Sequence, residues 1–504
     1  MHSRIKTRHV AVALLVFVSL KSFSQQNAHQ IAKTLIVQSM QAMGAGWDSV
    51  KTMSLDGYGY QNQIDESERP EGPYIPIQIQ RNILIDIAHN TSQVVQTTQS
   101  YIFGVTDTTV FNGDEIATKA GGAFVASQNG VELRDELNLS PEIALKKALG
   151  SPHLTYLKDT IYQKANHSIV SFRDKGFPVR IFLNKETSLI SAIEITRPFN
   201  QDFSGIWGDI KKTIIYSFWM VLSKGIHYPL QQDCYLNNYY KTSFLVDKWK
   251  INPAINSEAL QIPEDVKEQS KQLVGKQNEA FKQQVDKGGK QIAPGIWFIN
   301  GLCNTTVVEQ PDGIVIIESA FSSFYSDLII AKVHALIPGK KIKTLISTSD
   351  AWLHIGGMRS FAAIPGIKIY HPTRNQPLLE KLLKAPYKTE PDVLAKTANP
   401  SYTLNGVTDT LAVGTGSNKM VMYSYKTETG DRQMMVYFPQ HKLLYTSDLY
   451  QGKYKGDYWN KQIVWEVYHS IKTRKIDVQH FYAMHSRNLL DFKDLEKDVL
   501  ADMQ

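Results

Sequence analysis

The ten residues from Thr348 to Gly357, TSDAWLHIGG, decide how the C-terminal part of this chain is interpreted. They follow the apolar run Ile342-Lys343-Thr344-Leu345-Ile346, which predicts a strand. They end in the pair Gly356-Gly357, from which the next helical pattern starts. Within this loop, His354 and Asp350 carry the side chains that could do chemistry. The functional question is therefore what these two residues form with the rest of the chain.

Outward from the loop, the sequence alternates strand-like and helix-like runs from Gly295 to the C-terminus. Strands are predicted at 296–299, 305–309, 314–318 and 343–346, and a helix at 326–336. Such alternation is typical of a layered α/β domain.

The loop resembles that of the metallo-β-lactamase fold superfamily, which reads Thr-His-x-His-x-Asp-His-x-Gly-Gly. The resemblance covers residues 295–504, where three further segments are similar to family strands: GIWFINGLCNTTVVEQPDGIVIIESA, VYFPQHKLLYTSDLY and HFYAMHSR. It implies an αβ/βα sandwich and a metal-dependent hydrolase, with Glu318 at the place of the family's acidic strand-end residue. The family binds two metals, so the ligand positions can be compared one by one.

Most of the family's ligands are replaced. The three histidines of the first metal correspond to Ser349, Ala351 and a threonine, Thr427 or Thr429, so the first site is expected to be empty. The second site loses its loop aspartate to Leu353. The remaining second-site ligands are the predicted metal tripod, His354, Asp448 and His485. Two imidazoles and one carboxylate are the minimum for catalytic zinc or non-haem iron.

A structural interpretation stands beside the tripod. His354 could cap a helix, Asp448 could bind backbone N–H groups at a strand end, and His485 could lie in the core. Asp350 could place a catalytic carboxylate in the pocket, or it could cap a turn. The apolar Leu353 disfavours a charged metal next to it, because it cannot solvate the charge.

The N-terminal half has a different pattern. A helix is predicted from Ala28 to Met43, followed by short strand-like runs between 53 and 251 with one inserted helix at 141–149. They predict a large antiparallel sheet curved around the first helix. This arrangement resembles the half-barrel of periplasmic lipoprotein carriers and implies a small-molecule or lipid-like ligand. The aromatic stretch Tyr235, Tyr239, Tyr240, Phe244 and Trp249 would belong to the core or line such a groove.

The predicted fold is therefore α+β with two domains. We expect a signal peptide at 1–24, a β-rich half-barrel-like domain at 25–262, a helical linker at 263–289 and a metallo-β-lactamase-like domain at 290–504. Basic residues precede an apolar run from Val10 to Leu20, which predicts cleavage after Ser24 and a periplasmic or secreted protein. No later apolar stretch is long enough to span a membrane.

Composition excludes other classes. The chain of 504 residues is 42% hydrophobic and 20% charged, as globular proteins are, and its net charge of +7 forms no basic block that would indicate nucleic acid. Its two cysteines, Cys234 and Cys303, exclude a disulfide framework; they are expected to be buried thiols or one interdomain bridge.

Two functional hypotheses follow. The first is an exported hydrolase with an eroded site that holds at most one metal, zinc or iron. The second is a catalytically inactive binding or scaffold protein with no metal, whose N-terminal domain holds an apolar ligand. The sequence leaves open whether the protein is an enzyme.

Overall fold

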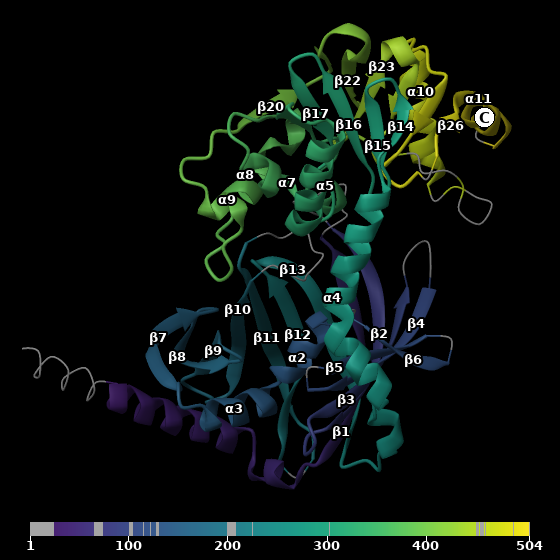
Figure 1. Cartoon of the computed structure of the whole chain (residues 1–504). Coiled ribbons are helices and arrows are strands. Elements are labelled where there is room, and N and C mark those ends of the chain that lie inside the picture. Colours follow the sequence, from purple (N-terminus) through teal and green to yellow (C-terminus); the bar gives the residue numbers. More distant parts are fainter. Residues whose placement is uncertain are drawn as a thin grey trace, which may run out of the picture. The chain divides into compact units, whose positions relative to one another are not determined.

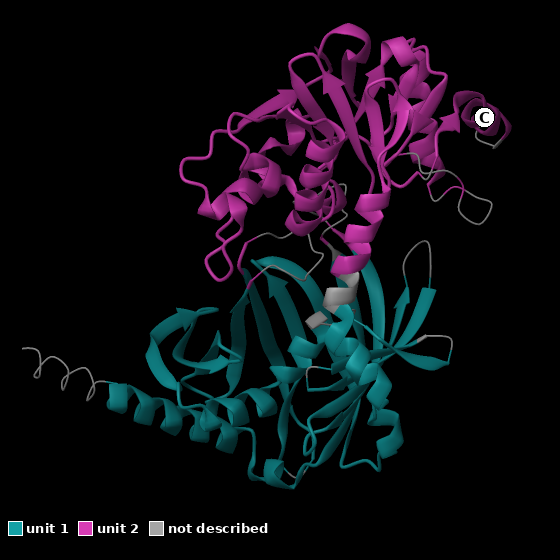
Figure 2. Ribbon diagram, in the orientation of Figure 1, with its two compact units in different colours: residues 1–62, 76–197, 210–273 teal, residues 63–75, 198–209, 274–504 magenta. Residues whose placement is uncertain are grey.

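The chain forms two compact units, which Figure 2 distinguishes by colour. Unit 1 comprises residues 1–62, 76–197 and 210–273, and unit 2 comprises 63–75, 198–209 and 274–504. The computed structural model describes residues 25–64, 74–99, 104–113, 115–120, 122–127, 131–198, 208–223, 225–301, 303–449, 453, 458, 460–486 and 488–502. The predicted signal peptide at 1–24 lies outside the described residues.

Unit 1 is built on one 13-stranded sheet with the order β6-β5-β4-β3-β2-β1-β13-β12-β11-β10-β9-β8-β7 (Figure 1). Its strands are β1 (Thr52–Gln63), β2 (Ile75–Asp86), β3 (Thr91–Gln99), β4 (Gly104–Asn112), β5 (Glu115–Ala120), β6 (Ala123–Ala126), β7 (Thr155–Tyr162), β8 (Ala165–Asp174), β9 (Phe177–Asn184), β10 (Ile190–Arg197), β11 (Ile210–Val221), β12 (His227–Leu236) and β13 (Tyr239–Ile251). The strand pairs of this sheet, including the pair of the distant strands β1 and β13, are antiparallel, which confirms the predicted large antiparallel sheet.

Helices and 3-10 turns flank this sheet. They are the helix at 25–42, η1 (Ala45–Ser49), α2 (Val131–Asn138), α3 (Pro141–Gly150) and η2 (Ser257–Leu260). The first helix was predicted at Ala28–Met43 and the inserted helix at 141–149, so both predicted helices are present with small shifts at their ends. α3 begins at a proline, which is favoured at the first helical position because its missing N–H has no partner there in any helix.

The aromatic stretch of β12 and β13 is divided between core and surface. Phe244 is buried in a hydrophobic cluster of unit 1, together with Met53, Ile83 and Tyr228. Tyr235 and Tyr240 stack with ring centroids 5.0 Å apart and are half-buried. Alternation of burial along the strands therefore assigns these aromatic residues to different faces of the sheet.

The predicted linker is helical. α4 (Glu264–Lys287) follows Pro263, carries Glu264 and Asp265 in its first turn and ends before Gly289, which has φ 105°. Among the residues that the structure describes, no helix is both long enough and apolar enough to cross a membrane. Cys234 and Cys303 are buried thiols of different units.

Unit 2 contains two mixed sheets. The first has the order β14-β15-β16-β17-β18-β19-β20, with β14 (Lys290–Ala293), β15 (Ile296–Ile299), β16 (Thr305–Gln310), β17 (Gly313–Ile317), β18 (Ile342–Ile346), β19 (Lys368–Pro372) and β20 (Thr403–Val407). The second has the order β21-β22-β23-β24-β25-β26, with β21 (Thr410–Val413), β22 (Met420–Ser424), β23 (Met434–Phe438), β24 (Leu443–Tyr445), β25 (His480–Tyr482) and β26 (Leu490–Asp491).

The helices of unit 2 connect these strands. They are α5 (Ser323–Leu336), α6 (Trp352–Ile355), α7 (Met358–Ala362), η3 (Thr373–Asn375), α8 (Gln376–Lys384), α9 (Val393–Lys396), η4 (Gly416–Asn418), η5 (Pro439–His441), α10 (Lys461–Thr473) and α11 (Phe492–Asp502). The expected alternation of strands and helices is therefore present, and it gives a mixed α/β unit.

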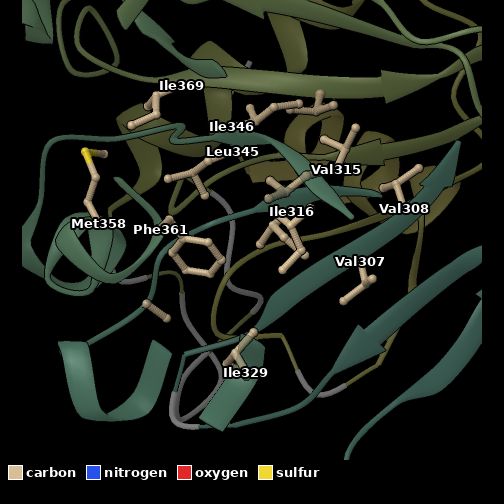
Figure 3. Close-up of a cluster of buried hydrophobic side chains, with 14 of the residues drawn as sticks. Val307, Val308, Val315, Ile316, Ile329, Leu345, Ile346, Met358, Phe361 and Ile369 are labelled. Carbon is tan, nitrogen blue, oxygen red and sulfur yellow. The ribbon is translucent and has the colours of Figure 1, made fainter. Parts of the chain in front are cut away.

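Two hydrophobic clusters define the layers of unit 2. The larger one combines the first sheet with α5, α7 and the inner face of the second sheet; Figure 3 shows part of it, including Val308, Ile316, Ile329 and Phe361. The other cluster packs the outer face of the second sheet against α10 and α11. The order of layers is thus helices, sheet, sheet, helices. Every residue of β17 is buried, as expected for a strand covered on both faces.

Parallel strands bring the candidate residues to one edge. β17, β18 and β19 run parallel in the first sheet, and β24 runs parallel to β25 in the second. Glu318 directly follows β17, Asp350 lies in the loop after β18, Asp448 follows β24 and His485 follows β25. Because the ends of parallel strands lie at the same sheet edge, residues far apart in sequence meet there.

Gly356 closes the loop in a place with no room for a side chain. A Cβ at this position would lie 2.2 Å from the Phe321 carbonyl oxygen and 2.9 Å from that of Trp352. We expect Gly356→Ala to lower the free energy of unfolding by about 1–3 kcal/mol, because backbone atoms must move. Gly150→Ala is the control, since a Cβ there meets nothing within 4 Å. Urea unfolding of both variants measures the difference; equal stabilities would contradict the steric argument.

Candidate functional site

His354 is the centre of a buried group of charges. It lies in the short helix α6 and is fully buried. Its backbone is fixed by the segment after β17, because its carbonyl accepts hydrogen bonds from Ser319 N at 3.1 Å and from Ser319 Oγ at 2.9 Å. The ring is therefore held in place by its own loop and by the neighbouring strand end.

Both ring nitrogens of His354 face carboxylates. Nδ1 lies 3.1 Å from Glu318 Oε2, and Nε2 lies 3.9 Å from Asp448 Oδ2. Burial by itself lowers the pKa of His354, but the negative charges of Glu318 and Asp448 outweigh it and raise the pKa to about 10. At neutral pH the ring is therefore an imidazolium cation. Neither nitrogen has an aligned hydrogen bond within the protein, so its interactions are mainly ionic.

Glu318 is held by hydroxyl donors. Its Oε1 accepts a hydrogen bond from Tyr445 Oη at 3.0 Å and another from Thr348 Oγ1. Thr348 Oγ1 also lies 2.7 Å from Ser447 Oγ, which connects the ends of β18 and β24. Glu318 and Ser447 have φ angles of 77° and 61°, in the left-handed region that non-glycine residues rarely adopt. Such strain is common at functional sites, where the surrounding contacts maintain it.

The row of charges continues towards solvent. Asp448 Oδ1 lies 3.4 Å from His485 Nε2, and both side chains are 25% exposed. The order is thus Glu318, His354, Asp448, His485, from the interior outward. His485 is not a core residue, as the structural interpretation would have it, and His354 lies within α6 instead of capping a helix.

Asp350 occupies a separate, buried position. Its Oδ2 lies 3.6 Å from Arg432 Nη1 and has no hydrogen bond within the protein. Burial raises the pKa of Asp350 to about 7, although Arg432 and His354 lower it and Asp431 raises it further. Asp350 is therefore partly protonated near neutral pH. The catalytic role that the sequence suggested for it stays a prediction.

The positions that lost histidines have local structural roles. Ser349 Oγ accepts a hydrogen bond from Ala351 N at 3.2 Å, and Ala351 itself precedes α6. Thr427 Oγ1 accepts from Gly430 N at 3.2 Å, while Thr429 donates to Glu466 on α10. Ser349 and Thr427 thus stabilise turns, and Thr429 connects its loop to α10.

Leu353 and Trp352 pack against the core. Leu353, at the place of the lost aspartate, is partly buried against the larger cluster of unit 2. Trp352 lies over Phe321, with ring centroids 5.3 Å apart. Leu353 therefore contributes apolar contact, and no oxygen, to the surroundings of His354.

The donor atoms do not form a metal site as arranged. Two atoms bound to the same tetrahedral zinc lie roughly 3.3 Å apart, given bonds of about 2.0–2.2 Å. Asp448 approaches both imidazoles, but through different oxygens. Throughout the described part of the chain, no three His, Cys, Asp or Glu side chains form a group that could hold a metal ion. His354 would also have to release its proton to bind a metal. The structure thus places the three side chains of the predicted tripod next to one another, but they do not form a metal-binding group.

Sequence reasoning did not identify several of the contributing residues. Thr348, Tyr445 and Ser447 hold Glu318 in place, and Arg432 pairs with Asp350. A signal existed for Arg432, since this arginine lies two residues before the apolar strand β23. Thr348 matches the threonine of the family loop, but its role was not predicted, and Tyr445 and Ser447 carry no signal because serine and tyrosine are common at strand ends.

Comparison with known proteins gives structural neighbours only. No family model and no curated protein matches the chain. Among solved structures, it is similar to the inverting sec-alkylsulfatase Pisa1 from Pseudomonas sp., with 15% identity, a TM-score of 0.32 and coverage of 43% of this chain and 40% of the sulfatase. The chain thus spans about two fifths of that enzyme.

Two metallo-β-lactamases are also similar. DIM-1 matches with 16% identity and a TM-score of 0.32 over 42% of this chain and 93% of the enzyme. The enzyme from Hirschia baltica matches with 15% identity and a TM-score of 0.32 over 42% and 97%. Because the sequence identities and TM-scores are this low, the function of the site has to be inferred from the residues of this chain.

The burial of Asp350 predicts a pH-dependent stability. Its pKa is higher in the folded protein, about 7, than its ordinary value of 3.8, so folding binds a proton. The resulting stability is complete below pH 4 and is lost as the pH rises through 7. Between pH 5 and 8, the wild type should lose about 1–3 kcal/mol relative to Asp350→Asn, which cannot ionise. Urea unfolding of both proteins at both pH values measures this difference. Equal losses of unfolding free energy in the wild type and in Asp350→Asn would contradict the raised pKa of Asp350.

The open donor arrangement predicts that the protein is purified without stoichiometric metal. We expect well below one zinc or iron per chain by elemental analysis of protein prepared without chelators. Added Zn²⁺ should not raise the melting temperature, because a tightly bound metal would stabilise the folded state by mass action. One zinc per chain, absent from His354→Gln, would instead establish the tripod as a metal site.

Proposed function

We propose that unit 2 is a hydrolase of the metallo-β-lactamase type of αβ/βα sandwich, in which protein side chains supply the catalytic charges. The substrate class is a carbonyl compound, an ester or an amide. The observation that carries the proposal is the row of Glu318, His354, Asp448 and His485, whose successive distances are 3.1, 3.9 and 3.4 Å. General base catalysis requires a base within hydrogen-bond reach of the attacking water, and the solvent-exposed His485 at the outer end of the row is the proposed base.

His485 is the proposed general base. Asp448 Oδ1 faces its Nε2, so Nε2 carries the hydrogen and Nδ1 keeps the lone pair. Nδ1 takes a proton from water as the water oxygen attacks the carbonyl carbon. When the bond to the alcohol or amine breaks, the proton passes from Nδ1 to the leaving group. The carboxylate of Asp448 orients the ring and stabilises its positive form, as an aspartate does in other base dyads.

His354 and Glu318 are positioning residues in this scheme. The imidazolium of His354 fixes one oxygen of Asp448 and leaves the other for His485. Glu318 maintains the charge of His354 and is itself fixed by Tyr445 and Thr348. Each group in the row is thus oriented by the one behind it, which keeps the exposed base in one geometry.

The alternative of a binding protein has one observation in its favour. Unit 1 contains an open cavity of about 700 Å³ next to η2 and the start of α4. Its lining combines Phe124, Leu260 and Ile262 with Asp86, His89 and Lys267. This mixture would suit a polar small molecule better than the apolar ligand that the half-barrel resemblance implies.

The test is turnover of p-nitrophenyl esters and anilides in the presence of EDTA. His485→Gln should lower kcat by at least about 100-fold, the size of effect expected for loss of a general base. His480→Gln is the matched control, because His480 lies at the other end of the same strand and should leave kcat unchanged.

Two results would overturn the proposal. One is equal turnover by wild type and His485→Gln. The other is activity that EDTA abolishes and Zn²⁺ restores, which would return the site to metal-dependent hydrolysis.

A further inference from the structure

Several of the buried polar atoms that have no hydrogen bond within the described part of the chain belong to the loop of His354 and to segments next to it. Besides the two ring nitrogens of His354, they include Asp350 Oδ2, His371 Nε2, Asn375 Oδ1 and Gln433 Oε1. An unsatisfied buried polar atom costs about 1–3 kcal/mol, so native proteins retain few of them. Several at one sheet edge indicate a missing partner.

Backbone contacts bring the segments that carry these atoms together. Ser347 N donates to Tyr370 O at 2.9 Å, which joins the loop of Asp350 to the segment of His371. Met434 N donates to Thr348 O at 2.9 Å, which joins the same loop to the segment of Gln433. Asn375 Nδ2 donates to Arg432 O at 2.8 Å, which joins the segment of His371 and Asn375 to the segment of Gln433. Three segments, 347–350, 370–375 and 432–434, therefore form one neighbourhood.

The open atoms of His371, Asn375 and Gln433 are acceptors, and so is Asp350 Oδ2 when its carboxyl group is ionised. His371 Nδ1 lies 2.8 Å from the Pro372 carbonyl oxygen, which can only accept, so Nδ1 carries the hydrogen and Nε2 is an acceptor. Asn375 uses its amide nitrogen on the Arg432 carbonyl, which leaves Oδ1 as the open group. His371 and Asn375 are fully buried, and Asp350 is 8% exposed. The missing partner must therefore donate hydrogen bonds.

Charge selects the kind of donor. The carboxylate of Asp350 already faces the guanidinium of Arg432 at 3.6 Å, so the neighbourhood has no unbalanced negative charge for a cation. An ammonium group or a metal ion would add a buried positive charge, which is costly. An amide nitrogen donates one or two hydrogen bonds without a charge.

We propose that His371, Asn375, Gln433 and Asp350 form a subsite that binds an uncharged amide N–H group of the substrate. The inference rests on the proposed hydrolase function and assigns it to amides in preference to esters. An ester in this place would leave the acceptors unpaired, and enzymes discriminate strongly against ligands that lack an expected donor. Asp350 thereby has a role in holding the substrate.

The experiment measures binding, not turnover. Saturation-transfer NMR on the full-length protein compares acetamide, which has two N–H donors, with N,N-dimethylacetamide, which has none. We expect acetamide to bind at least 10-fold more tightly. Gln433→Met should remove this difference, because methionine has the shape of glutamine without its acceptor oxygen. His371→Phe is a second variant that should have the same effect.

Stability distinguishes a binding role from a structural one. Gln433→Met should leave the melting temperature of the free protein unchanged or raise it, since an unsatisfied atom is removed. The control is Gln310→Met. Gln310 is buried, donates to Asn418 O at 2.7 Å and accepts from Thr415 N at 3.0 Å. This control should melt several degrees lower and keep the preference for acetamide.

Each contrary result has a definite meaning. Equal binding of the two amides by the wild type would overturn the subsite and leave water as the partner of these atoms. Tighter binding of methylammonium than of acetamide would overturn the choice of an uncharged donor. Preference for acetamide in a protein that hydrolyses nothing would preserve the subsite and reject the proposed hydrolase.

Discussion

The burial of one imidazolium cation between two carboxylates is the constraint on which this edge of unit 2 depends. His354 is fully buried and faces Glu318 and Asp448, which come from the ends of strands in different sheets. Removing one partner of a buried ion pair typically costs about 3–5 kcal/mol, because the other charge remains without compensation. The ends of β17 and β24 and the helix α6 must therefore keep their relative positions for the fold to persist.

Much of this edge could be predicted from the sequence, and the predictions concerned local patterns. Apolar runs such as Ile342 to Ile346 predict strands directly, and the strand-rich pattern between residues 53 and 251 corresponds to the large antiparallel sheet of unit 1. The grouping of His354, Asp448 and His485 came from the family resemblance, and the structure places these residues next to one another. The strands and the residues at their ends were thus predicted well, because their positions follow from the order of the strands.

The remainder depends on contacts that no local pattern specifies. In the described part of the chain the tripod does not form a metal-binding group; His354 and His485 approach different oxygens of Asp448 at 3.9 and 3.4 Å, and side-chain torsions of this kind cannot be derived from sequence spacing. The pairing of Asp350 with Arg432 joins residues that are 82 positions apart, and the hydroxyls around Glu318 come from β18 and β24. The positive charge of His354 also depends on Glu318 and Asp448 together, so neither sequence segment predicts it alone.

The residues at the replaced ligand positions explain why the positive charge at this site can come from a proton on His354 instead of a metal ion. Ser349 and Thr427 stabilise turns, and Leu353 packs against the core, so each substitution restores local stability without restoring a donor. His354 keeps its two acidic neighbours, and their negative charge still requires a cation. Protonation of the ring supplies that cation at neutral pH, as its raised pKa indicates. The same negative charge that would attract a metal ion therefore holds a proton on His354, and the outer end of the row, Asp448 and His485, is the part that solvent reaches.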